Sequence, residues 1–335
     1  MELRTLTDAF GPSGYENPVR TLIRQEAEKR CDDVSVARMG TLICRKPGRD
    51  RSKPAVAVAA HMDEIGFIVV GHTDDGLLRF RPVGGIDPRV VVSKWVLIGN
   101  DRLPGVIGAP PIHLQERDDL GKVLPFSKLH IDIGAKDQKE AESLAPLGSY
   151  AVFDTPYMEY GDGFVAAKAL DDRVGCFNLL KLLEEEYDCD LICVFVTQEE
   201  VGLRGSHTAA FSLDAEIAVV LEGTAANDLG DVEERFHVCT PGQGVAVSFM
   251  DRASIADRAL FKTMLKLARE QGIPAQVKRG ITGGNDAASF QRGGRGARVV
   301  VLSVPCRYIH SANNVAKWSD IRAQADLARA FLKSL

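Results

Sequence analysis

The chain has 335 residues, of which 45% are hydrophobic and 26% charged, a composition typical of a soluble globular protein with a large core. Its 46 acidic and 41 basic side chains give a formal net charge of −5 without a long run of one sign, which argues against nucleic acid or a membrane as a partner. The N-terminal segment lacks an apolar signal-peptide core, and no stretch of 18 apolar residues occurs, so we expect a cytoplasmic protein.

Continuous apolar runs rich in Val and Ile predict four buried strands of a parallel sheet, at residues 54–60, 191–197, 216–221 and 297–304. Helical periodicity predicts helices between and after these strands, at residues 173–187, 258–270 and 320–335. In the first of these helices, Val174, Phe177, Leu180 and Leu183 recur at a spacing of three and predict one apolar face. The alternation of strands and helices indicates an α/β fold with a mixed, largely parallel sheet and helices on both faces.

The stretch 69–163 has a different pattern, with short β-prone pieces broken by Gly, Pro and Asp turns and one helix-like segment around 137–147. We interpret it as a β-rich domain inserted into a discontinuous α/β domain formed by residues 1–68 and 164–335. The seven cysteines are scattered and include no C-x-x-C pair, so we expect neither a disulfide framework nor a thiolate zinc site.

Acids and histidines follow the predicted buried strands. His61 and Asp63 come after the first strand, Glu199 and Glu200 after the second, and Glu222 after the third, while His310 lies six residues beyond the fourth. Ligands in open α/β sheets bind outside the carboxyl ends of the strands, so these side chains are expected to meet in one crevice.

Imidazoles and carboxylates without thiolates are ligands suited to Zn²⁺, Co²⁺ or Mn²⁺. The set is large enough for two divalent metal ions, roughly 3.5 to 4 Å apart, an arrangement that activates water for amide hydrolysis. Each element also has a structural explanation when taken alone: Glu199 and Glu200 as a surface pair, Asp171 and Asp172 as a cap for the following helix, each histidine as a core residue. Their convergence at strand ends favours the metal site.

Four motifs resemble the family of tetrahedral and glutamyl aminopeptidases, some members of which have been labelled endoglucanases: HMDEIGFIV, KALDDRVG, TQEEVGLRGS and CRYIHS. Further matching pieces, among them GPSGYE, VGGIDPRV, IDIGAK and GGNDA, extend the similarity over nearly the entire chain. The resemblance implies an α/β catalytic domain with two metal ions, interrupted by a β-barrel-like domain used in subunit assembly. It also implies a dimer-based homo-oligomer, such as a tetrahedral dodecamer, that acts on short peptides with a free N-terminus.

The resemblance also assigns roles to individual residues. Asp171 would bridge the two metal ions, with Glu200 and His310 completing one site and His61 and Glu222 the other. Glu199 would be the general base, and Asp63 would orient the His61 ring. Gly283, Gly284 and Asp286 would bind the substrate. Many relatives have Asp where this chain has Glu222, which leaves the nearby Asp228 as an alternative ligand.

The residues leave other functions open. A related two-metal deacylase or carboxypeptidase would use the same ligands, a cellulase would need two carboxylates and no histidines, and a non-catalytic binding protein would need none of them. Comparison of free and N-acetylated peptides, and the effect of a chelator, separate these functions. Neither the preferred N-terminal residue nor the native metal follows from the sequence.

Overall fold

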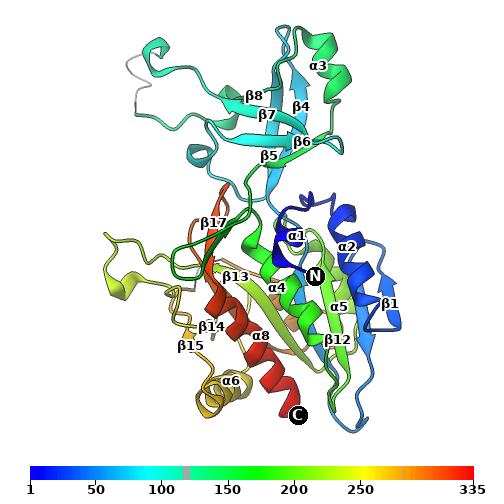
Figure 1. Cartoon of the computed structure of the whole chain (residues 1–335). Coiled ribbons are helices and arrows are strands. Elements are labelled where there is room, and N and C mark those ends of the chain that lie inside the picture. The colour runs from blue at the N-terminus through cyan, green and yellow to red at the C-terminus, as the bar shows by residue number, and fades with distance from the viewer. Residues whose placement is uncertain (116–120, 282) are drawn as a thin grey trace.

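A computed structural model of the chain describes residues 1–115, 121–281 and 283–335. A mixed sheet of eight strands, in the order β1-β2-β12-β3-β13-β16-β14-β15, forms the centre of the larger part of the molecule (Figure 1). The neighbouring strands β12, β3, β13 and β16 are parallel. Antiparallel pairs are β1 with β2, β2 with β12 and β14 with β16, whereas β15 is parallel to β14. The strand bounds are β1 (Asp33–Val36), β2 (Leu42–Lys46), β3 (Val56–His61), β12 (Leu191–Val196), β13 (Ile217–Ala225), β14 (Val245–Ser248), β15 (Ala275–Val277) and β16 (Arg298–Cys306).

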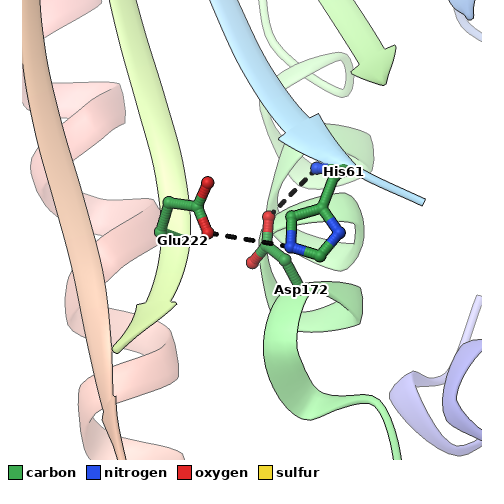
Figure 2. A group of neighbouring side chains, drawn as sticks. All are labelled: His61, Asp172 and Glu222. Atoms are coloured by element: carbon green, nitrogen blue, oxygen red, sulfur yellow. Dashed lines mark hydrogen bonds and ion pairs between the residues drawn. The ribbon is translucent and has the colours of Figure 1, made fainter. Parts of the chain in front are cut away.

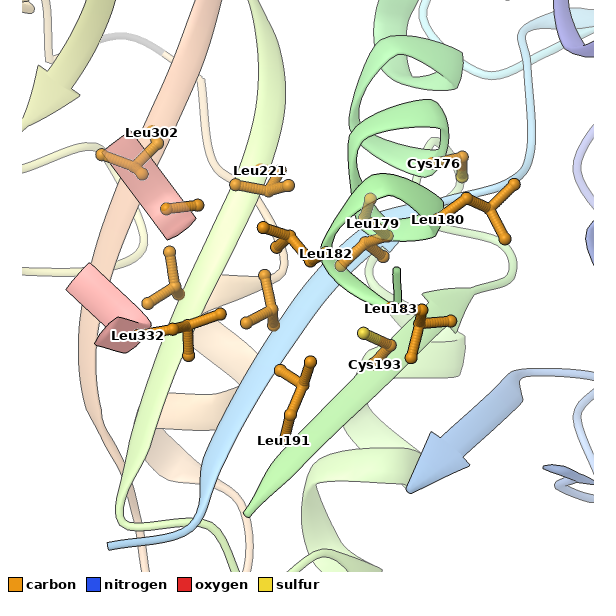
Figure 3. Close-up of a cluster of buried hydrophobic side chains, with 14 of the residues drawn as sticks. Cys176, Leu179, Leu180, Leu182, Leu183, Leu191, Cys193, Leu221, Leu302 and Leu332 are labelled. Carbon is orange, nitrogen blue, oxygen red and sulfur yellow. The ribbon is translucent and has the colours of Figure 1, made fainter. Parts of the chain in front are cut away.

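Helices cover both faces of this sheet, which confirms the predicted fold class. Alternate residues of β3 point to opposite sides: Val56, Val58 and Ala60 belong to one buried cluster, and Ala57 and Ala59 belong to another. The first cluster includes residues of α2, α4, α6 and α8, and the second includes residues of α5 and α7. Figure 3 shows part of the first cluster, where leucines of α4 pack against the strands. The helix bounds are α1 (Leu3–Thr7), α2 (Asn17–Ala27), α4 (Leu170–Leu182), α5 (Arg204–Ser212), α6 (Arg258–Gln271), α7 (Ala287–Arg292) and α8 (Trp318–Lys333).

A closed barrel forms the other end of the molecule (Figure 1). Its strands are connected in the order β4-β5-β8-β7-β6-β9 around a core that includes Phe67, Phe80 and Phe153. The bounds are β4 (Gly66–His72), β5 (Leu78–Val83), β6 (Trp95–Ile98), β7 (Leu103–Gly108), β8 (His130–Asp132) and β9 (Tyr150–Phe153), with α3 (Gln138–Leu144) as the predicted helical segment. Residues 116–120 of the predicted insert lie outside the described residues.

A small antiparallel sheet and short 3₁₀ helices complete the fold. The sheet has the order β10-β11-β17, with β10 (Met158–Tyr160), β11 (Phe164–Ala167) and β17 (Asn314–Lys317). The 3₁₀ helices are η1 (Pro88–Val90), η2 (Ile112–Leu114), η3 (Phe126–Lys128) and η4 (Glu234–Phe236). Within the described residues, no helix has both the length and the apolar character needed to cross a membrane.

Two sequence-based expectations differ from the structure for physical reasons. The helix predicted at 173–187 ends at Leu182, and its burial is not confined to one face, because α4 packs against the sheet, α8, α1 and α2 at once. The third strand does not end at Leu221 but continues to Ala225, since β13 stays paired with β16 over its whole length. Glu222 therefore lies within the strand and not after it.

Candidate metal centre

The central strands bring the predicted ligands together. His61 is the last residue of β3 and pairs with Val196, the last residue of β12, so the turn that holds Glu199 and Glu200 starts beside it. On the other side of β3, the parallel pairing with β13 reaches Val220 two residues before Glu222. The loop after β16 supplies His310.

His61, Asp172 and Glu222 form the first group, in which the potential ligand atoms lie within 4.8 Å of one another (Figure 2). All three side chains are buried. The imidazole Nε2 of His61 lies 3.8 Å from Oε2 of Glu222. Asp172 faces the backbone, because its Oδ2 accepts a hydrogen bond of 3.2 Å from the amide of His61 and its Oδ1 accepts one of 3.0 Å from the amide of Gly175. Asp172 thus caps the regular part of α4, as its position before a helix predicts.

Asp171, Glu200 and His310 form the second group. Nε2 of His310 lies 3.4 Å from Oε2 of Glu200. The other ring nitrogen, Nδ1, makes a hydrogen bond of 2.8 Å with the carbonyl oxygen of Gly85, in the loop after β5. This contact sets the orientation of the ring, so that Nε2 faces the carboxylates.

Asp171 lies between the two groups. Its Oδ1 is 3.5 Å from Nε2 of His61, and its Oδ2 is 3.9 Å from Nε2 of His310. The glycine at position 223 permits this placement, because a Cβ atom there would lie only 2.9 Å from Oδ1. One carboxylate therefore faces both histidines at once.

Asp63 links the ring of His61 to the turn after β12. Nδ1 of His61 makes a hydrogen bond of 3.0 Å with the carbonyl oxygen of Asp63 and lies 3.5 Å from its Oδ1. The Asp63 carboxylate also accepts hydrogen bonds from Ser13 Oγ at 2.6 Å and from the amides of Glu199 and Glu200 at 3.0 and 3.2 Å. Although burial alone raises its pKa, contact with His61 holds the pKa of Asp63 below its usual value. The buried carboxylate is therefore ionised and fixes both segments.

The three glutamates of the centre, Glu199, Glu200 and Glu222, resist ionisation as long as only protein surrounds them. Burial, followed by nearby charges, raises the pKa of Glu222 and of Glu199 well above the usual value. Burial likewise raises the pKa of Glu200 to about 7. The pKa of His61 is raised as well, because the Asp171 and Asp63 carboxylates outweigh the lowering effect of burial. Like charges crowded in a buried site require positive charge to ionise together.

The donor set fits divalent cations. Oδ1 of Asp171 and Oε1 of Glu222 are buried and accept no hydrogen bond within the described residues. Native proteins rarely leave such atoms without a partner. Imidazole nitrogens and carboxylate oxygens, with no thiolate nearby, suit Zn²⁺, Co²⁺ or Mn²⁺. Asp228 does not compete with Glu222 as a ligand, because both of its oxygens accept hydrogen bonds from Arg307, at 2.9 and 2.6 Å.

A cavity of about 460 Å³ opens onto both groups. Its lining includes Glu199 and, among the predicted substrate-binding residues, Gly283 and Gly284. Asp286 is fully buried and does not line the cavity, and burial raises its pKa to about 7. The sequence predicts Asp172 only as a possible helix cap, with no place in the metal site, and it does not single out Gly85, whose carbonyl oxygen contacts His310.

Comparisons with known proteins agree with this architecture. The sequence profile described as M42 glutamyl aminopeptidase matches residues 40–327. A putative aminopeptidase of Acetivibrio thermocellus is 36% identical over 321 residues, covering 95% of this chain and 94% of the relative. The lysyl aminopeptidase of Pyrococcus furiosus is 30% identical over 345 residues, covering 99% and 96%. Among solved structures, the TET1 peptidase of Pyrococcus horikoshii, which can assemble into a tetrahedron or a large octahedral shell, is 33% identical with a TM-score of 0.87, covering 99% and 98%.

Proposed function

The chain belongs to the M42 glutamyl aminopeptidase family, and we propose that it removes single residues from the N-termini of short peptides with two divalent metal ions bound at the strand ends. The observation that carries this proposal is the position of Asp171, whose two carboxylate oxygens face the two histidines of the centre. A carboxylate shared between two sets of ligands would hold two ions close together, as two-metal hydrolysis requires.

The ligands divide into two sets. His61 and Glu222 would hold one ion, Glu200 and His310 the other, and Asp171 would contact both. Zn²⁺ suits these donors, and Co²⁺ or Mn²⁺ are alternatives. Glu222 takes the place of the Asp found in many relatives, and its unpartnered buried oxygen supports this role.

Bound ions of this kind polarise the substrate carbonyl and lower the pKa of a water molecule. Glu199 lines the cavity without a place in either group, which leaves its carboxylate available for the reaction. We infer that it accepts a proton from the attacking water and then donates a proton to the leaving amine. Positive charge from the ions would counter the high pKa that burial gives Glu199 and keep it ionised at neutral pH.

Asp63 acts as a positioning residue. Its backbone carbonyl and carboxylate both face Nδ1 of His61, which directs Nε2 toward the centre. Its hydrogen bonds to the amides of Glu199 and Glu200 hold the proposed base and a proposed ligand in one turn. Gly283 and Gly284 would contact the substrate where they line the cavity. Asp286, fully buried behind them, would act on the substrate only through neighbouring groups.

We further propose that the chain forms homo-oligomers through residues 69–163, as an inserted assembly domain. The barrel exposes several large apolar side chains, among them Trp95, Leu144 and Leu147, which are 58%, 49% and 67% exposed. Contiguous apolar patches on a surface mark contacts between subunits, and these side chains are the candidates for such a patch in this domain. Light scattering after size-exclusion chromatography would distinguish a dimer from a dodecamer of the 36.4 kDa chain.

Hydrolysis of X-Ala-Ala peptides tests the function directly. Metal-stripped protein is assayed with and without Zn²⁺, Co²⁺ or Mn²⁺, on peptides that are either free or N-acetylated. We expect cleavage of the free peptides only, and only after metal is restored. Cleavage of the acetylated forms would point to a deacylase, and activity that does not depend on metal would remove the two-metal proposal.

A further inference from the structure

The catalytic cavity contains a basic side chain that neither ligand group uses. Lys278 directly follows β15 and lines the cavity together with Val238 and Gly284. Among the described residues that line this cavity, it is the one Lys or Arg side chain.

This lysine is buried, and its ammonium group has no partner in the part of the chain that the structure describes. Lys278 is only 6% exposed, whereas lysine is almost never fully buried unless it is paired. The backbone amide of Lys278 donates to the carbonyl oxygen of Val247, which fixes the main chain. Its ammonium group makes no hydrogen bond or ion pair within residues 1–115, 121–281 and 283–335. A positive charge is thus held in the cavity without an anion to balance it.

The carboxylates of the metal centre do not supply that anion. The charges with the largest effect on the pKa of Glu199 and of Glu222 are those of His61 and neighbouring acids, and Lys278 is not among them. Lys278 instead acts on the Cys239 thiol, whose pKa of about 12 is raised by burial and lowered by this ammonium group. The ammonium group thus lies near Cys239, which follows the cavity residue Val238 in the sequence.

Three arginines near Lys278 in the sequence, at positions 279, 295 and 298, do not line this cavity. Arg279 is exposed, and its guanidinium donates to the carbonyl oxygen of Glu234. Arg295 and Arg298 pair with acids at the surface, at 3.8 Å from Asp214 and 3.1 Å from Asp257.

We propose that Lys278 is a specificity-determining residue that binds a carboxylate of the peptide substrate. The proposal rests on the proposed aminopeptidase function and names the substrate class of the same site. Two groups of a short peptide carry this chemistry, the side chain of an N-terminal Glu or Asp and a free C-terminal carboxylate. A charge-assisted hydrogen bond to an ammonium group inside the cavity would favour the charged substrate over its neutral amide by about 10- to 100-fold in kcat/KM.

The test compares two substrate pairs with the metal-loaded enzyme. For the side chain, Glu-Ala-Ala-amide is compared with Gln-Ala-Ala-amide, which differs only in charge and hydrogen bonding at the first residue. For the terminus, Leu-Ala-Ala is compared with Leu-Ala-Ala-amide. Each ratio of kcat/KM is measured for the wild-type enzyme, for Lys278→Met, which keeps the apolar stem, and for Lys278→Arg, which keeps the charge. Arg279→Met is the matched control, because it removes a charge from the adjacent exposed position.

We expect one of the two ratios to be about 10 or more in the wild type, to fall toward 1 in Lys278→Met, and to persist in part in Lys278→Arg and fully in Arg279→Met. The pair that responds identifies which carboxylate Lys278 binds. Ratios near 1 in the wild type, or ratios that Lys278→Met does not change, would overturn the proposal while leaving the aminopeptidase function intact. Failure of the metal-loaded wild type to cleave any of the four peptides would instead contradict the proposed function itself. Circular dichroism and bound-metal content show whether each variant is folded.

Discussion

Replacement of Asp63 by Ala tests whether one buried carboxylate organises the centre. The change removes the acceptor of three hydrogen bonds, from Ser13 Oγ and from the amides of Glu199 and Glu200, at 2.6 to 3.2 Å. Because the residue is fully buried, water cannot readily replace the lost partners. Hydrogen bonds to a charged acceptor contribute about 1.5 to 3 kcal/mol each, and they are not additive within one network. We expect the free energy of unfolding to fall by about 3 to 5 kcal/mol.

The same substitution should weaken metal binding, because the His61 ring loses the carboxylate beside its Nδ1. Loss of such an outer contact typically lowers metal affinity by about 10- to 100-fold. Urea unfolding of the metal-free protein measures the first effect, and titration of the ions followed by calorimetry measures the second. Asp101→Ala, an exposed Asp in the turn between β6 and β7, serves as the control. If the free energy of unfolding of Asp63→Ala lies within about 0.5 kcal/mol of the wild-type value and the variant binds metal equally well, this carboxylate does not organise the centre.

Three further outcomes test the assignments within the centre. Glu199→Gln should retain both ions by elemental analysis but lose about 100- to 10,000-fold in kcat, and retained turnover would exclude Glu199 as the base. Glu222→Ala should lower the affinity for one of two ions by at least about 10-fold. Asp228→Asn should leave metal binding unchanged, because it removes a charge already paired with Arg307. Equal metal affinities of the two variants would contradict the assignment of Glu222 as a ligand. Removal of metal by a chelator should lower the melting temperature, since an ion present at 100 times its Kd stabilises the folded state by about 2.7 kcal/mol, and an unchanged melting temperature would argue against bound ions.

The fold could be predicted from the sequence where burial leaves a simple pattern. The strands β3, β12, β13 and β16 are covered by helices on both faces, so each is a continuous apolar run that the sequence displays directly. The ends of these strands place His61, Glu200 and His310 around one cavity. Strand ends were therefore sufficient to find most of the proposed ligands.

Other features depend on contacts that no local pattern encodes. The pairing of β13 with β16 extends the strand beyond Leu221, and this tertiary pairing places Glu222 inside the sheet. The burial of α4 on several sides comes from α1, α2 and α8, which lie far away in the sequence. The burial of Lys278 could not be predicted for the same reason, since a Lys-Arg pair after a short strand is typical of an exposed turn. The segment around Lys278 is held by contacts with residues distant in the sequence, since the amides of Lys278 and Arg279 donate to the carbonyl oxygens of Val247 and Val238.

The proposed ligands are attached to deeply buried elements, and this burial has a physical consequence. Asp171, Asp172 and Glu222 place three carboxylates in a region where burial raises the pKa of two of them well above the usual value. Separation of these groups, by a shift of β13 or α4, would relieve their repulsion. The apolar contacts of Leu179, Leu182 and Leu221 in the core beneath them oppose such a shift (Figure 3). Because that core holds the carboxylates together in the metal-free protein, the free energy of binding the proposed ions would not include a cost of assembling the ligands, which would favour high affinity.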